Sequence, residues 1–286
     1  MMPQAAFRAT SATFILLCIP GIARSQDASA WDSAGHAAAR LIAGATLRTA
    51  DASWLRAGIE IRLDPGWKTY WRYPGDSGVP PTLDFAGSEN VKSVQVLWPA
   101  PERFDDGAGG HSIGYRGDVV LPLRIAAKDA SEPTLLRVKL GYAICGNLCI
   151  PAEADIDLML SGESGTEEPA LAAAEAHVPR RVSLGEREGL AIRSVHREAD
   201  GAHQHVVVEV AAPEGAPVEL FAEGPTPDWA LPVPEPTGAA SAGAPRTRVF
   251  TFDLDGLPPD AHGQGAAVTL TAVSPDAAIE VGAHLD

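Results

Sequence analysis

The stretch LRVKLGYAICGNLCIPAEADIDLML, residues 136–160, decides the fold of the first half of the chain. Apolar residues recur at every second position before the two cysteines and again after them, which is the period of a β-strand. The first series is Leu136, Val138, Leu140, Tyr142 and Ile144, and the second is Ile150, Ala152, Ala154, Ile156, Leu158 and Leu160. The pattern predicts a hairpin of two strands that turns at residues 146–148.

This turn sets the register of the two strands, because each residue before it then faces one particular residue after it. Two of the resulting cross-strand pairs join like residues, and two join opposite charges, which stabilises a sheet. The four pairs are Cys145–Cys149, Ile144–Ile150, Lys139–Asp155 and Arg137–Asp157. Four independent matches support one hairpin, although Leu148 stands where a three-residue turn often has glycine.

Cys145 and Cys149 share the parity of the charged residues, so both side chains are expected to be exposed on the face away from the core. Directly opposed residues have Cα atoms about 4.5–5.5 Å apart, which a disulfide accepts. A bridge that closes so short a loop removes little entropy from the unfolded chain, so it stabilises the fold only slightly. Exposed bridges are often easily reduced. Geometry alone leaves open a structural staple and a redox pair. A metal site is less favoured, because two thiolates are half a tetrahedral set.

The N-terminus resembles a secretory signal peptide, with a basic residue, a short apolar stretch and small residues before Gln26. We expect cleavage after residues 1–25, which removes Cys18 and changes the formal charge from −15 to −17. A strongly acidic chain disfavours nucleic acid and anionic membranes as partners. No later apolar stretch is long enough to span a bilayer, so the mature chain is expected to be exported, with its two remaining cysteines in an oxidising compartment.

Short runs rich in Val, Leu and Ile alternate with Pro and Gly clusters along the whole chain, as in antiparallel β-sandwiches. One helical pattern, at residues 167–178, interrupts them and suggests a linker. We therefore predict an all-β fold of two tandem sandwich domains with a short helical linker. The expected boundaries are residues 26–162, 163–182 and 183–286.

Four segments, in this order, resemble the N-terminal periplasmic domain of the thiol:disulfide interchange protein DsbD family. They are DPGWKTYWRYPGDSGVPPTLDF (64–85), VLWPAPERFDDG (96–107), IGYRGDVVLPLRI (113–125) and LGYAICGNLCIPAEA (140–154). The CxxxC spacing is similar to the branch called suppressor of copper sensitivity protein B, ScsB. The resemblance implies an immunoglobulin-like fold for the first domain and, more loosely, a second domain of the same branch.

The resemblance also implies a function for the cysteines. Cys145 and Cys149 would be a redox pair in the periplasm, in which Cys149 attacks the partner and Cys145 resolves the mixed disulfide. Residues 103–117 resemble the family's cap loop, which shields the cysteines, although the loop is rich in glycine here. The candidate cap residues are Phe104, Asp105, Asp106, His111 and Tyr115. No cofactor is implied.

The expected partners are a membrane-embedded electron donor and periplasmic thioredoxin-like or disulfide isomerase-like proteins. Because the sequence has neither a membrane domain nor a thioredoxin domain, the donor is expected to be a separate chain. The activity would be that of a protein-disulfide reductase type of oxidoreductase, in the context of cytochrome c biogenesis or copper tolerance. The alternative is a periplasmic binding or assembly protein, for copper or for an assembly partner, with a purely structural disulfide.

Two further groups of residues leave alternatives open. Trp67, Tyr70, Trp71 and Tyr73 could form a sugar-binding face, but aromatics that cover one end of a sandwich are the more common arrangement. His196, His203 and His205 flank a predicted turn and could bind copper, although exposed histidines on strands usually bind nothing. No motif of a hydrolase is present.

Overall fold

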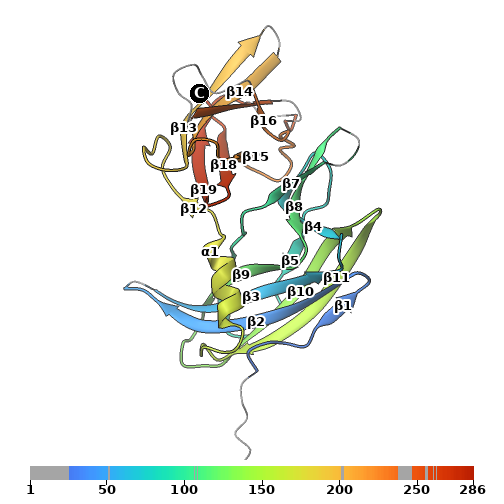
Figure 1. Cartoon of the computed structure of the whole chain (residues 1–286). Coiled ribbons are helices and arrows are strands. Elements are labelled where there is room, and N and C mark those ends of the chain that lie inside the picture. Colours follow the sequence, from blue (N-terminus) through green and yellow to red (C-terminus); the bar gives the residue numbers. More distant parts are fainter. Residues whose placement is uncertain are drawn as a thin grey trace, which may run out of the picture.

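The computed structural model describes residues 26–50, 52–105, 107, 109–200, 203–237, 247–254, 257–259, 261 and 263–286. The predicted signal peptide, residues 1–25, lies outside the described residues. Within the described part of the chain, the structure consists of strands and one helix, arranged in a lower and an upper body (Figure 1). The all-β fold predicted from the sequence is confirmed.

The lower body, here called the first sandwich, contains two sheets. Its strands are β1 (Asp32–Ala34), β2 (Ala37–Arg48), β3 (Ser53–Leu63), β4 (Lys68–Gly75), β5 (Thr82–Asp84), β6 (Val91–Val96), β7 (Glu102–Asp105), β8 (His111–Arg116), β9 (Val119–Ala127), β10 (Thr134–Cys145) and β11 (Cys149–Leu160). One sheet has the order β1-β2-β3-β9-β6, and the other has the order β11-β10-β4-β8-β7 with β5 paired to β10. Apolar residues of both sheets form one core, because alternate side chains of each strand face inward.

The β10–β11 hairpin has the predicted register along its whole length. Cys145 faces Cys149, and all four predicted cross-strand pairs are present. Arg137 lies opposite Asp157 in the register. Its ion pair, however, is with Glu89, at 3.1 Å. Ile150, expected in the core, is 37% exposed, because it lies beside the turn at the end of the sandwich.

The upper body, here called the second sandwich, follows the helix α1 (Glu168–Ala176). Its strands are β12 (Arg180–Arg181), β13 (Ala191–Asp200), β14 (His203–Ala211), β15 (Glu219–Glu223), β16 (Glu235–Pro236), β17 (Thr247–Asp253), β18 (Ala267–Ser274) and β19 (Ala277–His284). They form the sheets β12-β19-β18-β15 and β13-β14-β17-β16 around a separate apolar core. The helix lies within residues 167–178, where the sequence pattern predicted one, while the predicted linker and domain boundaries stay a prediction.

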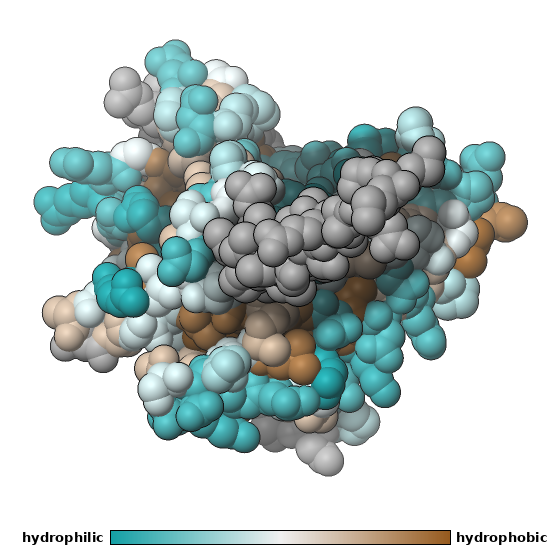
Figure 2. Space-filling view, turned by 90° about the horizontal axis from the view of Figure 1, so that it is seen from below, coloured by the Kyte–Doolittle hydropathy of each residue, from teal (hydrophilic) through white to brown (hydrophobic). Residues whose placement is uncertain are grey.

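The helix is fixed to the first sandwich by charge and by packing. Leu171 is fully buried, and Arg56 of β3 donates hydrogen bonds to Glu175 at 2.9 and 2.7 Å. Among the described residues, no helix has the length and apolar character needed to cross a membrane. Seen from below, the surface is largely hydrophilic, with apolar side chains showing in a smaller area (Figure 2).

Candidate functional site

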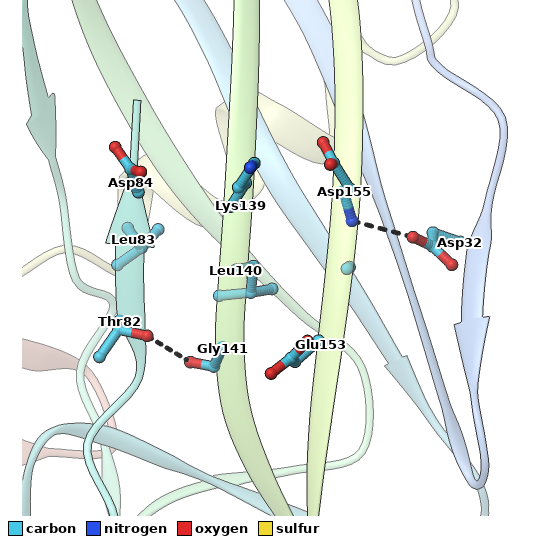
Figure 3. A pocket seen from close by; sticks show the side chains of 10 residues that line it. Asp32, Thr82, Leu83, Asp84, Lys139, Leu140, Gly141, Glu153 and Asp155 are labelled. Carbon is cyan, nitrogen blue, oxygen red and sulfur yellow. Dashed lines mark hydrogen bonds between the residues drawn. The ribbon is translucent and has the colours of Figure 1, made fainter. Parts of the chain in front are cut away.

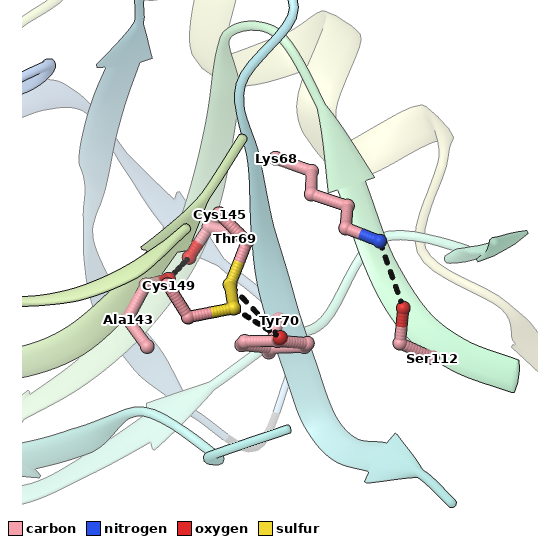
Figure 4. Close-up of a disulfide and its surroundings, with 7 residues drawn as sticks. All are labelled: Lys68, Thr69, Tyr70, Ser112, Ala143, Cys145 and Cys149. Atoms are coloured by element: carbon pink, nitrogen blue, oxygen red, sulfur yellow. Dashed lines mark hydrogen bonds between the residues drawn. A yellow bond between two sulfur atoms is a disulfide. The ribbon is translucent and has the colours of Figure 1, made fainter. Parts of the chain in front are cut away.

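The two cysteines at the end of the β10–β11 hairpin form a disulfide (Figure 4). Their Cα atoms lie 4.1 Å apart, which is closer than the roughly 4.5–5.5 Å expected for directly opposed residues. Both side chains leave the hairpin on the face opposite to the main core, since Cys145 belongs to a small separate cluster with Tyr70 and Ala143. The predicted parity of the cysteines is therefore correct.

The predicted exposure of both cysteines is wrong for one of them. Cys145 is only 1% exposed, whereas Cys149 is exposed. The cause is a side chain from another strand, because Tyr70 of β4 covers Cys145 on the outer face of the hairpin. Cys145 is thus enclosed by protein, whereas the Cys149 residue is exposed to solvent.

Tyr70 contacts both sulfur atoms through its hydroxyl group. Its Oη lies 2.9 Å from Sγ of Cys145 and 3.3 Å from Sγ of Cys149. Because disulfide sulfurs carry no hydrogen, the phenol O–H is the donor in this state. Burial raises the pKa of Tyr70 above its ordinary value, so the phenol keeps its proton at neutral pH and remains a donor.

Strand β4 is held beside the disulfide by hydrogen bonds to β10. Lys68 and Thr69 pair with Cys145 and Ile144, and Oγ1 of Thr69 donates to the carbonyl oxygen of Ala143 at 2.9 Å. The Lys68 ammonium group points toward Oγ of Ser112, 3.1 Å away (Figure 4). The side chain whose hydroxyl group contacts both sulfur atoms is that of Tyr70, a neutral phenol.

The turn that joins the cysteines rests on an aromatic ring. A Cβ atom at Gly146 would lie 3.2–3.4 Å from atoms of the Trp67 indole, so glycine is needed here for close approach. Positive φ is not the reason, because no residue of the turn has it, and this explains how Leu148 is tolerated. The Trp67 ring also stacks on His36, with 4.1 Å between ring centroids.

Exposed apolar side chains lie close to Cys149, on the turn beside it and on the segment after β4. Val79 is 60% exposed, Leu148 is 73% exposed and Ile150 is 37% exposed. Ile150 and Val79 help to line a hollow of about 290 Å³ that includes Cys149 itself. Exposed apolar side chains grouped in one place are typical of protein-binding surfaces.

A second, larger depression lies along the same face of the hairpin, further from the disulfide (Figure 3). It has a volume of about 610 Å³ and shares Thr82, Gly141 and Glu153 with the hollow at Cys149. Lys139 stands between Asp84 and Asp155 on its floor (Figure 3). The charged side chains that line this depression are mainly acidic, because the other two carboxylates are Asp32 and Glu153 and the cation is Lys139.

Phe104, Asp105, His111 and Tyr115, the candidate cap residues that the structure describes, lie on β7 and β8. Phe104 is buried, with the cationic groups of Lys68 and Arg116 over its ring at 4.9 and 4.8 Å. Nε2 of His111 lies 3.2 Å from the carboxylate of Glu235 in the second sandwich.

The other three cap residues are similarly occupied or undescribed. Tyr115 is packed in the main core, and its hydroxyl donates to the carbonyl oxygen of Pro99 at 2.9 Å. Asp105 is exposed and accepts a hydrogen bond from the backbone N–H of Gly107, and Asp106 lies outside the described residues. In this structure the shielding contact comes from Tyr70, and the cap role of residues 103–117 stays a prediction.

The histidines considered for copper are only partly brought together. His196 and His205 both contact the carboxylate of Glu198, at 3.0 and 3.4 Å, while the side chain of His203 is outside the described part. Among the described residues, no group of three or more His, Cys, Asp or Glu side chains is placed to hold a metal ion.

Tyr70 was considered from the sequence only as one of four clustered aromatic residues, and its contact with the disulfide was not predicted. Its signal was present, because Tyr70 lies in the first of the four segments that carry the family resemblance. Strand alternation could not reveal it, since Tyr70 and Cys145 are 75 residues apart.

Comparison with known proteins agrees with this geometry. Residues 40–161 match the family described as thiol:disulfide interchange protein DsbD, N-terminal. Among solved structures, the crystal structure of the N-terminal periplasmic domain of ScsB from Proteus mirabilis is similar in fold, with a TM-score of 0.69 and 23% sequence identity over 91% of this chain and 99% of that chain. No curated protein matches the sequence. Residues 40–161 of this chain therefore form a domain of the DsbD N-terminal family, the resemblance first indicated by the segments around the cysteines.

Proposed function

We propose that the chain is a periplasmic thiol-disulfide exchange module in which Cys149 is the sulfur that reacts with the partner and Cys145 resolves the mixed disulfide. The observation that carries this proposal is the unequal burial of one bonded pair, since Cys149 is exposed and Cys145 is enclosed under Tyr70. Exchange needs access for an incoming sulfur, and only one of the two cysteines offers it.

In the reducing direction the pair starts as two thiols. The Cys149 thiolate attacks one sulfur of the partner's disulfide, a new intermolecular S–S bond forms, and the partner's other sulfur leaves as a thiolate. The Cys145 thiolate then attacks Sγ of Cys149 and releases the partner's first sulfur. Two electrons and two protons pass to the partner, and the pair ends as the disulfide seen here.

Tyr70 gives the buried cysteine a hydrogen-bond donor during this cycle. When Cys145 is reduced, the same O–H that lies 2.9 Å from its sulfur can donate to the thiolate. Hydrogen bonds to charged acceptors are stronger than those to neutral ones. This contact therefore favours formation of the resolving thiolate in an otherwise apolar cluster.

The partners fitting this site are proteins with accessible disulfides or dithiols. We propose a separate membrane-embedded chain as electron donor and periplasmic thioredoxin-like proteins as acceptors. The exposed apolar side chains of Val79, Leu148 and Ile150 support contact with another protein directly beside the reactive sulfur. The periplasmic location is supported by the family match and by the similar ScsB domain.

A redox titration tests this proposal. The full chain is equilibrated with glutathione buffers of graded ratio, and the reduced fraction of the Cys145–Cys149 pair is counted by thiol alkylation and mass spectrometry. A relay should equilibrate with these buffers. A potential well below about −300 mV would instead identify an inert structural bridge and overturn the proposal.

A further inference from the structure

Four consecutive residues of β4 connect the disulfide to the second sandwich. Tyr70 contacts both sulfurs, while the next three side chains contact the second sandwich or pack against it. The ring of Trp71, fully buried, lies 5.9 Å from that of Phe221 between centroids. The hydroxyl of Tyr73 donates to the carbonyl oxygen of Leu231 at 2.5 Å.

Arg72 makes the strongest of these contacts. Its guanidinium donates to both carboxylate oxygens of Glu223 at 2.8 and 2.7 Å, and to Glu280 at 2.7 Å. The three side chains are largely buried, with exposed fractions of 23%, 16% and 13%. Paired guanidinium–carboxylate hydrogen bonds fix geometry as well as charge.

The backbone of β4 lacks ladder partners where these contacts occur. Its pairing with β8 stops at Tyr70 and resumes only at Gly75 after a shift in register, and its pairing with β10 covers Lys68 and Thr69 alone. Over this irregular part of β4, the side chains of Trp71, Arg72 and Tyr73 all contact the second sandwich. The position of Tyr70, the last paired residue, depends on what holds the segment after it.

We infer that the second sandwich positions Tyr70 against the disulfide through Arg72, and thereby sets how readily the Cys145–Cys149 pair is reduced. Arg72 is a positioning residue, since it contacts Glu223 and Glu280 and acts on the sulfurs only through the neighbouring Tyr70. The inference rests on the proposed exchange function and adds a role for the second sandwich in it.

The test is the glutathione equilibrium of the full chain carrying Arg72→Gln, which removes the charge and keeps a polar side chain. A loosened Tyr70 is a poorer donor to the reduced pair, so we expect the equilibrium constant for reduction to fall two- to tenfold. In a Tyr70→Phe background the same substitution should have no effect, because the hydroxyl through which Arg72 acts is absent.

Glu235→Gln is the matched control, because Glu235 also joins the sandwiches, but through Arg103 of β7 at 2.9 Å and His111 of β8 at 3.2 Å. It should leave the equilibrium constant unchanged. If Arg72→Gln does not fold, Glu223→Gln breaks the same contact and carries the same expectation.

Three results would overturn the inference: no change with Arg72→Gln or Glu223→Gln, an equal change in the Tyr70→Phe background, or an equal change with Glu235→Gln. Failure of the exchange proposal is distinguishable from all three. In that case the unsubstituted chain itself would not equilibrate with glutathione.

Discussion

Replacing Tyr70 with phenylalanine isolates the contribution of one hydroxyl group to the redox chemistry. Phenylalanine keeps the ring that covers Cys145 and removes only the O–H that lies 2.9 Å from its sulfur. In the oxidised pair this hydrogen bond has a neutral acceptor and is worth about 0.5–1.5 kcal/mol, whereas a bond to a charged acceptor is worth about 1.5–3 kcal/mol. Tyr70 therefore stabilises the reduced pair more than the oxidised pair whenever Cys145 is a thiolate.

The difference between the two states is about 1–2 kcal/mol, and for a two-electron couple about 1.4 kcal/mol corresponds to 30 mV. We expect Tyr70→Phe to lower the reduction potential by roughly 20–40 mV, with the larger shift at higher pH, where more thiolate is present. The assay is titration against glutathione buffers at several pH values.

Tyr142→Phe is the control for this measurement. It also removes a buried hydroxyl from the hairpin region, but the described structure gives that hydroxyl no hydrogen-bond partner. Its potential should equal that of the unsubstituted chain. An unchanged or higher potential for Tyr70→Phe would refute the view that the phenol favours the reduced pair.

Three further predictions concern stability. Gly146→Ala places a methyl group 3.2 Å from the Trp67 ring, and urea unfolding should show a loss of about 1–3 kcal/mol. Phe221→Ala empties a fully buried site, which should cost about 3–5 kcal/mol in the same assay. Burial opposes ionisation of Glu175, but the hydrogen bonds and charges of Arg56 and Arg124 together outweigh it and lower the pKa of this carboxyl below 4.5. The ion pair of Arg56 and Glu175 therefore stabilises the fold above about pH 4.5, and this contribution is lost as the pH falls through the lowered pKa. Arg56→Gln should lower the free energy of unfolding at pH 6, and urea unfolding at pH 3 should show a smaller loss.

The hairpin could be predicted from the sequence because the residues that determine it lie close together along the chain. Alternating apolar residues and the charged pairs fixed one register, and this register alone placed Cys145 opposite Cys149. The face of each cysteine followed from the same parity. An all-β fold interrupted by one helix could likewise be predicted from short apolar runs and a single helical pattern.

Exposure could not be predicted in this way, because it depends on contacts between distant segments. Cys145 is buried by Tyr70, which comes from another strand, and Ile150 is exposed because the sandwich ends beside it. The aromatic segment around Tyr70 had been expected to cover one end of a sandwich. Its side chains instead diverge, as Trp71 enters the main core and Tyr73 reaches the second sandwich.

The most direct test of the central claim is to trap the mixed disulfide with single-cysteine variants. Full chains carrying Cys145→Ser or Cys149→Ser are incubated with an oxidised thioredoxin-like protein, and covalent complexes are detected on non-reducing gels and by mass spectrometry. Because Cys149 is the exposed sulfur, Cys145→Ser should form a stable complex and Cys149→Ser should form none. A complex with Cys149→Ser alone would reverse the roles of the two cysteines, and no complex with either variant would contradict the exchange function.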